Sequence, residues 1–287
     1  MPREQISPTV RRLRLGQELK LLRERQMINA KTLAAALKWS ASKVSRIEAA
    51  KTLPSPEDIK ALGAYLGVDQ DKIDELLVLL KEADRRGWWE YYENALSPEV
   101  ITFLGLEAEA IAHRAWGPQI VHGLLQTEDY ARELILAGSG VARITHSVMQ
   151  MRLDVRLKRQ EEILSRSRPP QLSLVLDESV LVRQFGEPRV MRDQLGHVLD
   201  MSALDHVSVQ VLPFAGGQHP VQTGEFIHLK FVDLDDAVYL ESLYGGRIVD
   251  DLQLVPNYEA AFERLRAVAL PEDESRILIQ RKLSHWR

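Results

Sequence analysis

Apolar residues recur at helical spacing from Val10 to Leu80, and no β-strand pattern interrupts them. Asn29 and Ser40 are candidate N-caps, since each is a polar residue that precedes a new apolar period. Prolines at positions 54 and 56 separate the next helix from the one before it. The stretch therefore predicts about five short helices that share one core.

Residues 29–55 have the spacing of a helix-turn-helix. The two short helices share apolar positions, which leaves the outer face of the second helix free. That face carries Ala41, Ser42, Lys43, Ser45 and Arg46. Because these residues are small or hydrogen-bonding, they can approach base edges and phosphates in a DNA groove. The segment therefore predicts binding to duplex DNA.

Residues 33–55, LAAALKWSASKVSRIEAAKTLPS, resemble the helix-turn-helix of the Cro/repressor-like (XRE) transcription regulators. The shared features are an LA pair, a tight turn and a serine-rich second helix that ends in S-x-I-E. Two positions depart from the family pattern. Ala30 replaces a glutamine that contacts phosphate, and Lys38 replaces the glycine of the turn. Neither change touches a core position, so the family fold is expected.

The resemblance also implies roles for individual polar residues. It implies base contacts by Ser40, Ala41, Ser42, Lys43 and Arg46, and phosphate contacts by Asn29, Lys31, Ser45 and Lys51. It further implies a structural ion pair between Glu48 and Arg23. Such a pair would fix how the second helix is presented rather than read bases.

Charge is divided unevenly along the chain. The first 51 residues carry a net charge of +8, whereas the whole chain of 287 residues carries −4, so the remainder carries −12. Opposite charge on two segments suggests two modules with different partners, and the basic module favours a polyanion such as DNA. The alternative is that these lysines and arginines only solubilise a small helical domain.

Composition excludes several classes of protein. The absence of cysteine excludes disulfides, thiolate metal sites and a cysteine nucleophile. A hydrophobic content of 45% and a charged content of 27% are typical of a folded globular protein. No apolar run approaches the roughly 18 residues of a membrane span, and the first residues are charged where a signal peptide needs an apolar run. We therefore expect a cytoplasmic protein without a membrane partner.

The sequence pattern changes after residue 83. Residues 84–104 contain clustered tryptophans and tyrosines and are interpreted as an aromatic linker that packs on a domain, with base stacking as the functional alternative. Beyond the linker, helices are predicted at 107–116, 127–137, 147–165, 187–204, 251–268 and 272–282, and strands at 172–176, 207–212, 225–231 and 237–241. The expected fold is an N-terminal all-α helix-turn-helix bundle over residues 1–83, followed by an α+β domain with a small mixed sheet over residues 105–287.

The second domain also has recognisable motifs, namely VHGLLQTEDYAR at 121–132, VLDE at 175–178, VQVLPF at 209–214 and YLE at 239–241. They are similar to the C-terminal domain of unknown function found in actinobacterial helix-turn-helix regulators that are described as antitoxin-like. Genes for these regulators are often adjacent to one for a small acidic protein, so the resemblance implies such a partner. One departure is His122, where the family usually has proline.

Three arginines, Arg152, Arg156 and Arg159, lie at i, i+4 and i+7 of the helix predicted over 147–165 and form one stripe. One interpretation is a solvated face that pairs with Glu161 and Glu162. The other is a docking surface for the acidic partner protein.

A pocket for a small effector, lined by the 209–219 loop and residues 239–241, is a further hypothesis, with His219 and Glu241 as its polar residues. A histidine close to Glu225, Asp177 and Glu178 is also the minimum for acid/base chemistry. However, the chain has no G-x-S-x-G elbow, no glycine-rich phosphate loop and no H-E-x-x-H spacing. We therefore expect no enzyme activity, no cofactor and no metal.

These patterns together favour a sequence-specific DNA-binding transcription regulator whose second domain dimerises and senses a small protein or ligand. Two alternatives are a protein-interaction adaptor that binds DNA weakly and, less well supported, an enzyme with an appended DNA-binding domain. A homodimer is expected because one short recognition helix reads too few base pairs to find a genomic site.

Overall fold

The computed structural model describes residues 7–142, 144–216, 219–221, 224–232, 234–242 and 245–286. It divides into two compact units, unit 1 (Met1–Tyr91) and unit 2 (Tyr92–Arg287). The boundary between the units falls within the segment predicted as a linker. Each unit is described by itself below.

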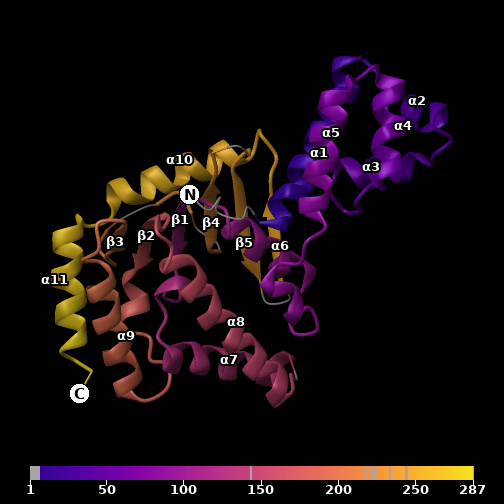
Figure 1. Cartoon of the computed structure of the whole chain (residues 1–287). Helices are drawn as coiled ribbons and strands as arrows, with labels where there is room; N and C mark the ends of the chain where they lie inside the picture. Colours follow the sequence, from indigo (N-terminus) through magenta and orange to yellow (C-terminus); the bar gives the residue numbers. More distant parts are fainter. Residues whose placement is uncertain are drawn as a thin grey trace. The chain divides into compact units, whose positions relative to one another are not determined.

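Unit 1 is a bundle of helices (Figure 1), and its described residues form α1 (Pro8–Arg25), α2 (Ala30–Ala36), α3 (Ala41–Glu48), α4 (Pro56–Leu66) and α5 (Gln70–Ala83). The caps predicted at Asn29 and Ser40 are present, since the Asn29 side chain accepts a hydrogen bond from the backbone N–H of Thr32 and Ser40 from that of Lys43. The prediction of about five short helices is confirmed.

The core of unit 1 is aliphatic and draws on every helix. Its buried members include Leu19 of α1, Leu33 of α2, Ile47 of α3, Ile59 of α4 and Leu76 of α5. Burial of these side chains is the main source of stability for helices this short, because isolated helices of this length are marginal in water.

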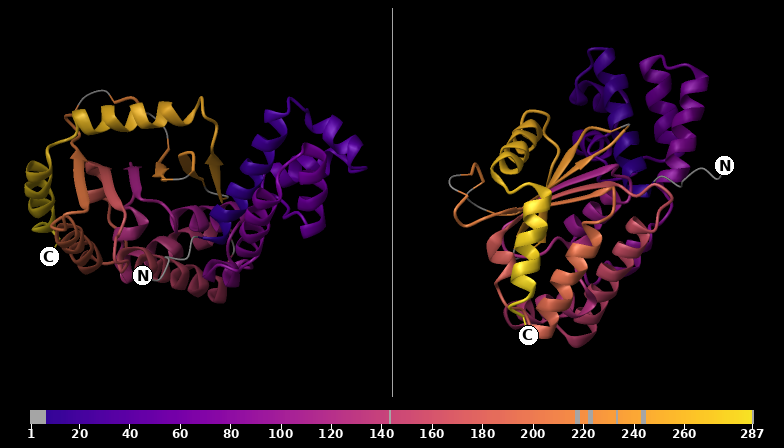
Figure 2. Two further views of the ribbon diagram at one scale, coloured as in Figure 1. Left: turned by 45° about the horizontal axis from the view of Figure 1, so that its top comes forward. Right: turned by 90° about the vertical axis from the view of Figure 1, so that its left-hand side faces the viewer.

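The described residues of unit 2 form a six-stranded sheet and the helices around it (Figures 1 and 2). The helices are α6 (Pro98–Glu107), α7 (Glu128–Ala142), α8 (His146–Leu164), α9 (Pro188–Met201), α10 (Val255–Val268) and α11 (Glu272–Leu283). The strands are β1 (Ala112–Gly117), β2 (Gln171–Asp177), β3 (Val207–Leu212), β4 (Phe226–Lys230), β5 (Ala237–Ser242) and β6 (Gly245–Val249).

The sheet is mixed, with strand order β3-β2-β1-β4-β5-β6. The strands β1, β2 and β3 run parallel, whereas β4 pairs antiparallel with both β1 and β5, and β5 pairs antiparallel with β6. The strands predicted at 172–176 and 207–212 pair in parallel, and those predicted at 225–231 and 237–241 pair antiparallel. The fold class predicted from the sequence is therefore confirmed.

Both faces of the sheet are covered (Figure 2). Leu174 of β2 lies in a core with residues of α7, α8, α9 and α11, whereas its neighbour Val175 lies in a second core with Phe262 of α10. Successive side chains of a strand point to opposite faces, so a strand covered on both sides must be apolar throughout. This requirement explains the apolar run LVL in β2.

The secondary structure predicted from the sequence was wrong around residues 98–117 and missed one strand. The helix predicted at 107–116 is instead the end of α6 followed by β1, a central strand between β2 and β4. Hydrogen bonding to two neighbouring strands outweighs the local helical pattern there. The helix α6 begins earlier, where Ser97 caps it and Pro98 occupies its first turn, and it crosses the boundary expected at 104/105. The strand β6 was not predicted.

The aromatic residues of the predicted linker differ in exposure. Trp89 is buried, whereas Tyr91 is exposed.

None of the helices in the described ranges combines the length and the apolar character that a membrane span requires.

Candidate DNA-binding surface and candidate effector pocket

The second helix of the helix-turn-helix, α3, has one buried and one open face. Val44 and Ile47 are buried in the core of unit 1, whereas Ser42, Ser45 and Arg46 are exposed. The guanidinium of Arg46 makes no ion pair within the described part of the chain, so its five donors are available. The open face therefore has the small hydrogen-bonding residues and the single long cation that groove binding requires.

An ion pair binds the carboxyl end of α3 to α1. Arg23 donates two hydrogen bonds to Glu48, from Nε to Oε1 at 2.6 Å and from Nη2 to Oε2 at 2.8 Å, and the two side chains are only 9% and 12% exposed. The hydrogen bond to Glu48, with the charges of Glu48 and Glu24, raises the pKa of Arg23, although burial of the guanidinium opposes that rise. This is the pair that the resemblance implied. It holds α3 at a set angle to α1.

A glycine on α1 permits the close approach of the two helices. A Cβ atom built on Gly16 would lie 2.7 Å from the backbone oxygen of Glu48. Because that neighbour is backbone and cannot move aside, any larger residue at position 16 would displace α3 from α1.

The turn between α2 and α3 has a left-handed residue where the family has glycine. Lys38 has φ = 55°, and the following residue, Trp39, donates a backbone hydrogen bond of 2.8 Å to Ala34. This arrangement closes α2 and turns the chain into α3. A side chain in the left-handed region is strained, so Lys38 occupies a position that suits glycine better.

One residue expected to contact bases is engaged within unit 1. The ammonium of Lys43 lies 2.6 Å from Oδ1 of Asp58 and 4.2 Å from the ring centre of Trp39. Both contacts hold the side chain against the body of unit 1 and compete with any contact to DNA. Among the basic residues assigned to base contact, Arg46 is the one left unpaired in the described structure.

The remaining candidate DNA contacts are exposed. Ser40 Oγ caps α3 and lies 3.0 Å from Ser42 Oγ, and Asn29 caps α2. Lys31 and Lys51 lie in solvent. The free backbone N–H groups at the amino ends of α2 and α3 add partial positive charge that favours phosphate.

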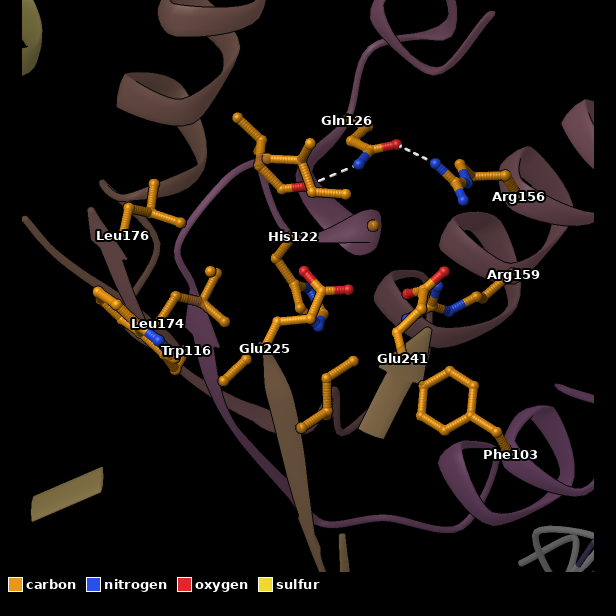
Figure 3. Close-up of a pocket in the computed structure, with 16 residues that line it drawn as sticks. Phe103, Trp116, His122, Gln126, Arg156, Arg159, Leu174, Leu176, Glu225 and Glu241 are labelled. Carbon is orange, nitrogen blue, oxygen red and sulfur yellow. Dashed lines mark hydrogen bonds between the residues drawn. The ribbon is translucent and has the colours of Figure 1, made fainter. Parts of the chain in front are cut away.

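Unit 2 contains a cavity of about 40 Å³ (Figure 3). Arg156 and Arg159 of α8 and Glu241 of β5 line it, so three of the five residues assigned to an effector site come together. The other two do not line it. Arg152 donates to the backbone oxygen of Ala95, and the ring of His219 lies 5.3 Å from that of Trp116. In the 209–219 loop, Gly217 and Gln218 lie outside the described residues.

The arginine stripe of α8 is not a solvated face, which corrects the first interpretation. Arg159 is buried and binds Glu107 of α6 through both carboxylate oxygens, rather than Glu161 or Glu162. Burial raises the pKa of Glu107, and the charge of Arg159 opposes that rise. The same burial removes Arg159 from any docking surface for an acidic protein.

Arg156 is oriented by a chain of hydrogen bonds (Figure 3). Its Nη1 donates to Gln126 Oε1 at 2.6 Å, and Gln126 Nε2 donates to the backbone oxygen of Val121, also at 2.6 Å. Gln160 donates to the backbone oxygens of Gly123 and Gln126 and so fixes the same loop. Burial lowers the pKa of Arg156. The arginine is thus held at the wall of the cavity by contacts that do not neutralise its charge.

Two carboxyl groups oppose each other at the cavity. In the antiparallel pair β4–β5, Phe226 lies opposite Leu240, which sets Glu225 opposite Glu241. Burial of Glu225, and then the charge of Glu241, raise the pKa of Glu225 to about 8. The sequence patterns alone did not place Glu225 at this site, although pairing the strands predicted at 225–231 and 237–241 as a hairpin would have brought it there.

His122, noted in the sequence only as a departure from the family pattern, also lines the cavity. Its Nδ1 accepts a hydrogen bond from the backbone N–H of Leu124 at 3.3 Å. Burial and the charges of Arg159 and Arg156 lower the pKa of His122 to about 3, so the ring is neutral. Its one proton therefore resides on Nε2, which is buried and has no partner in the described structure.

Comparisons with known proteins identify both units. A family model described as "Helix-turn-helix domain" matches residues 14–76, and one described as "Domain of unknown function (DUF5753)" matches residues 100–281. No curated protein and no solved structure matches the chain.

Proposed function

The chain belongs to the DUF5753 family and carries a helix-turn-helix domain before the family region, and from this premise we propose that it is a sequence-specific DNA-binding transcription regulator of the XRE type. The recognition helix α3 enters the major groove, with Arg46 as its main base-reading side chain. The observation that carries the proposal is the open face of α3 on a helix that Arg23 and Gly16 hold in place.

In this proposal, unit 2 dimerises and senses a signal and has no catalytic role. A homodimer on a two-fold symmetric operator would double the number of base pairs read. Exposed apolar side chains on unit 2, among them Phe214, Leu252 and Ile277, supply surface for such pairing. The signal is a small ligand in the cavity beside α8, or the small acidic protein that the antitoxin-like resemblance implies.

Selection from fragmented genomic DNA, followed by sequencing of the bound fragments, tests the proposal. A regulator of this type should enrich a short motif with approximate two-fold symmetry, and Arg46→Ala should reduce that enrichment and relax the motif at one base. Lys81→Ala is a matched control, because Lys81 is exposed and lies outside the matched residues 14–76. Recovery of random fragments by the wild-type chain would contradict the proposal.

The contacts of Lys43 favour a second candidate function. Because its ammonium pairs with Asp58, α3 presents few side chains that distinguish bases. An adaptor that binds DNA weakly and without sequence preference, and acts through a protein partner, would have such a surface. It would recover all genomic fragments alike, with an affinity that falls steeply as salt increases.

A further inference from the structure

The cavity of unit 2 is lined by two acidic side chains and two arginines. Arg159 and Glu107 neutralise each other through two hydrogen bonds. The remaining charged groups are Arg156 on one side and the carboxyl groups of Glu225 and Glu241 on the other. Arg156 balances one carboxylate, so the second carboxyl group is neutral only while it holds a proton, and a bound cation can take the place of that proton.

The strand register brings the two acidic side chains together. Directly opposed residues of antiparallel strands have neighbouring Cβ atoms, and Glu225, the residue before β4, continues the β4–β5 register to lie beside Glu241. The next positions in the same cross-strand row are glycines, Gly117 of β1 and Gly246 of β6, since Trp116 lies opposite Phe226 and Glu241 lies opposite Gly246. The row therefore supplies no cationic side chain to either carboxyl group.

His122 provides an independent sign that a ligand belongs here. Its ring is 7% exposed, and the N–H at Nε2 has no acceptor in the described structure. A buried donor without a partner is costly, and native structures seldom retain one without a reason. Figure 3 shows this ring and both carboxyl groups directed into the same space.

We propose that the cavity binds a small organic ammonium ion that also carries a hydroxyl or carbonyl oxygen. The ammonium group lies between Glu225 and Glu241, and the oxygen accepts the hydrogen bond from His122 Nε2. The aromatic and aliphatic wall, formed by Phe103, Trp116, Leu174 and Ile227, contacts the carbon atoms of the ligand. This inference rests on the proposed function, because it names the class of signal that unit 2 would sense.

The size of the cavity limits the ligand. A volume of about 40 Å³ holds only a few water-sized groups, so a compact molecule fits without rearrangement. Ethanolamine has the required ammonium and hydroxyl groups and serves as the probe. Ethylene glycol is its neutral counterpart, and glycolate is its anionic counterpart.

Binding of the cation should displace one proton. In the free protein Glu225 retains a proton at neutral pH, because its pKa is about 8. An ammonium ion beside the pair makes the ionised form of Glu225 favourable, so the proton leaves to solvent as the ion binds. The affinity for the ammonium ion should therefore increase about tenfold for each unit by which the pH rises, up to about pH 8. The charged and titratable groups around Glu225 are Glu241 and Tyr239 on β5, Arg156 and Arg159 on α8, and His122 on the loop before α7.

Isothermal titration calorimetry of the full-length chain without DNA tests the inference. Ethanolamine should bind in the millimolar range, with release of about one proton at neutral pH, measured by comparing buffers of different ionisation enthalpy. Ethylene glycol and glycolate should not bind. Binding of glycolate in place of ethanolamine, or no binding of ethanolamine at pH 8, would overturn the inference.

Variants separate the two contacts. Glu225→Gln should weaken ethanolamine binding by about tenfold or more and abolish proton release, whereas Glu161→Gln, an exposed change on α8, should alter neither. Ethanolamine should bind more tightly than ethylamine to the wild type, and His122→Phe should remove that preference. If His122→Phe does not fold, the comparison of the two amines on the wild type still decides the point. Unchanged ethanolamine binding in Glu225→Gln would overturn the inference.

The outcome is independent of the DNA-binding proposal. Loss of ethanolamine binding in a chain that still selects its operator overturns the ligand inference alone. A chain that binds ethanolamine but recovers only random DNA fragments overturns the proposed function alone.

Discussion

Arg23 of α1 holds Glu48, the last residue of α3, through two hydrogen bonds of 2.6 and 2.8 Å. The contact joins two elements that are adjacent in space and 25 residues apart in the chain. Because the pair fixes the orientation of α3 on α1, removing either partner should lower the stability of unit 1 before it changes any preference among bases.

Removal of Glu48 should destabilise unit 1. Glu48→Ala leaves the nearly buried guanidinium of Arg23 without its main partner, and the expected loss in unfolding free energy is about 3 kcal/mol. Urea denaturation measures this loss. Glu24→Ala is the matched control, since Glu24 contacts the same guanidinium at 3.4 Å from an exposed position and should cost less than about 1 kcal/mol. Equal losses for the two variants would contradict the role assigned to the pair.

Glycine at position 38 should stabilise the helix-turn-helix. Lys38 has φ = 55°, so Lys38→Gly relieves strain worth about 1 kcal/mol and should raise the melting temperature. Lys31→Gly provides the contrast, because Lys31 lies inside α2, where glycine costs about 1 kcal/mol. A loss of stability in Lys38→Gly would mean that its side chain makes a compensating contact.

Two basic residues of unit 1 should affect DNA binding differently. Arg46→Ala should cost about 1–3 kcal/mol on the preferred sequence and relax the preference at one base. Lys51→Ala, which removes an implied phosphate contact, should weaken binding to all sequences alike and reduce the salt dependence by about one charge. Fluorescence anisotropy over a sequence library and a salt series distinguishes the two. Equal binding by the wild type and Arg46→Ala would exclude the base-reading role.

The carboxyl pair of unit 2 should make its stability depend on pH. The pKa of Glu225 is raised from 4.5 to about 8, so its folded form holds a proton that the unfolded chain releases more readily. The associated stability is fully present below pH 4.5 and is lost as the pH rises through about 8, with a slope of at most about 1.4 kcal/mol per pH unit.

Glu225→Gln should remove this pH dependence, and Glu161→Gln should retain it. Urea unfolding of each variant as a function of pH measures the difference. A wild-type chain whose unit 2 gains stability as the pH rises across this window would show that Glu225 is ionised in the native state.

The chain should form a homodimer through unit 2. The buried leucines of unit 1 are used in its own core, and among the described residues unit 2 exposes more large apolar side chains than unit 1. Light scattering should give a dimeric mass for the full-length chain at micromolar concentration and a monomeric mass for residues 1–91. A monomeric full-length chain, or an equally dimeric fragment, would count against this assembly.

Local sequence determined much of the fold. The helix caps at Asn29 and Ser40, and most of the strands of unit 2, could be predicted because capping and strand formation depend on residues close in the chain. Prediction failed at 107–116, where two flanking strands decide the structure. Strand partners lie tens of residues away, so a periodic pattern within one segment does not reveal them.

The chemistry of the cavity in unit 2 was decided by tertiary structure. The sequence placed Arg156 and Arg159 on one helix face, but only the fold brought Glu107 of α6 to Arg159 as a buried partner and left Arg156 at the cavity. Likewise, the register of β4 and β5 set Glu225 beside Glu241. The charge and capping preference of a side chain follow from its own atoms and near neighbours. Its burial, its partner and its pKa depend on which distant segments pack around it.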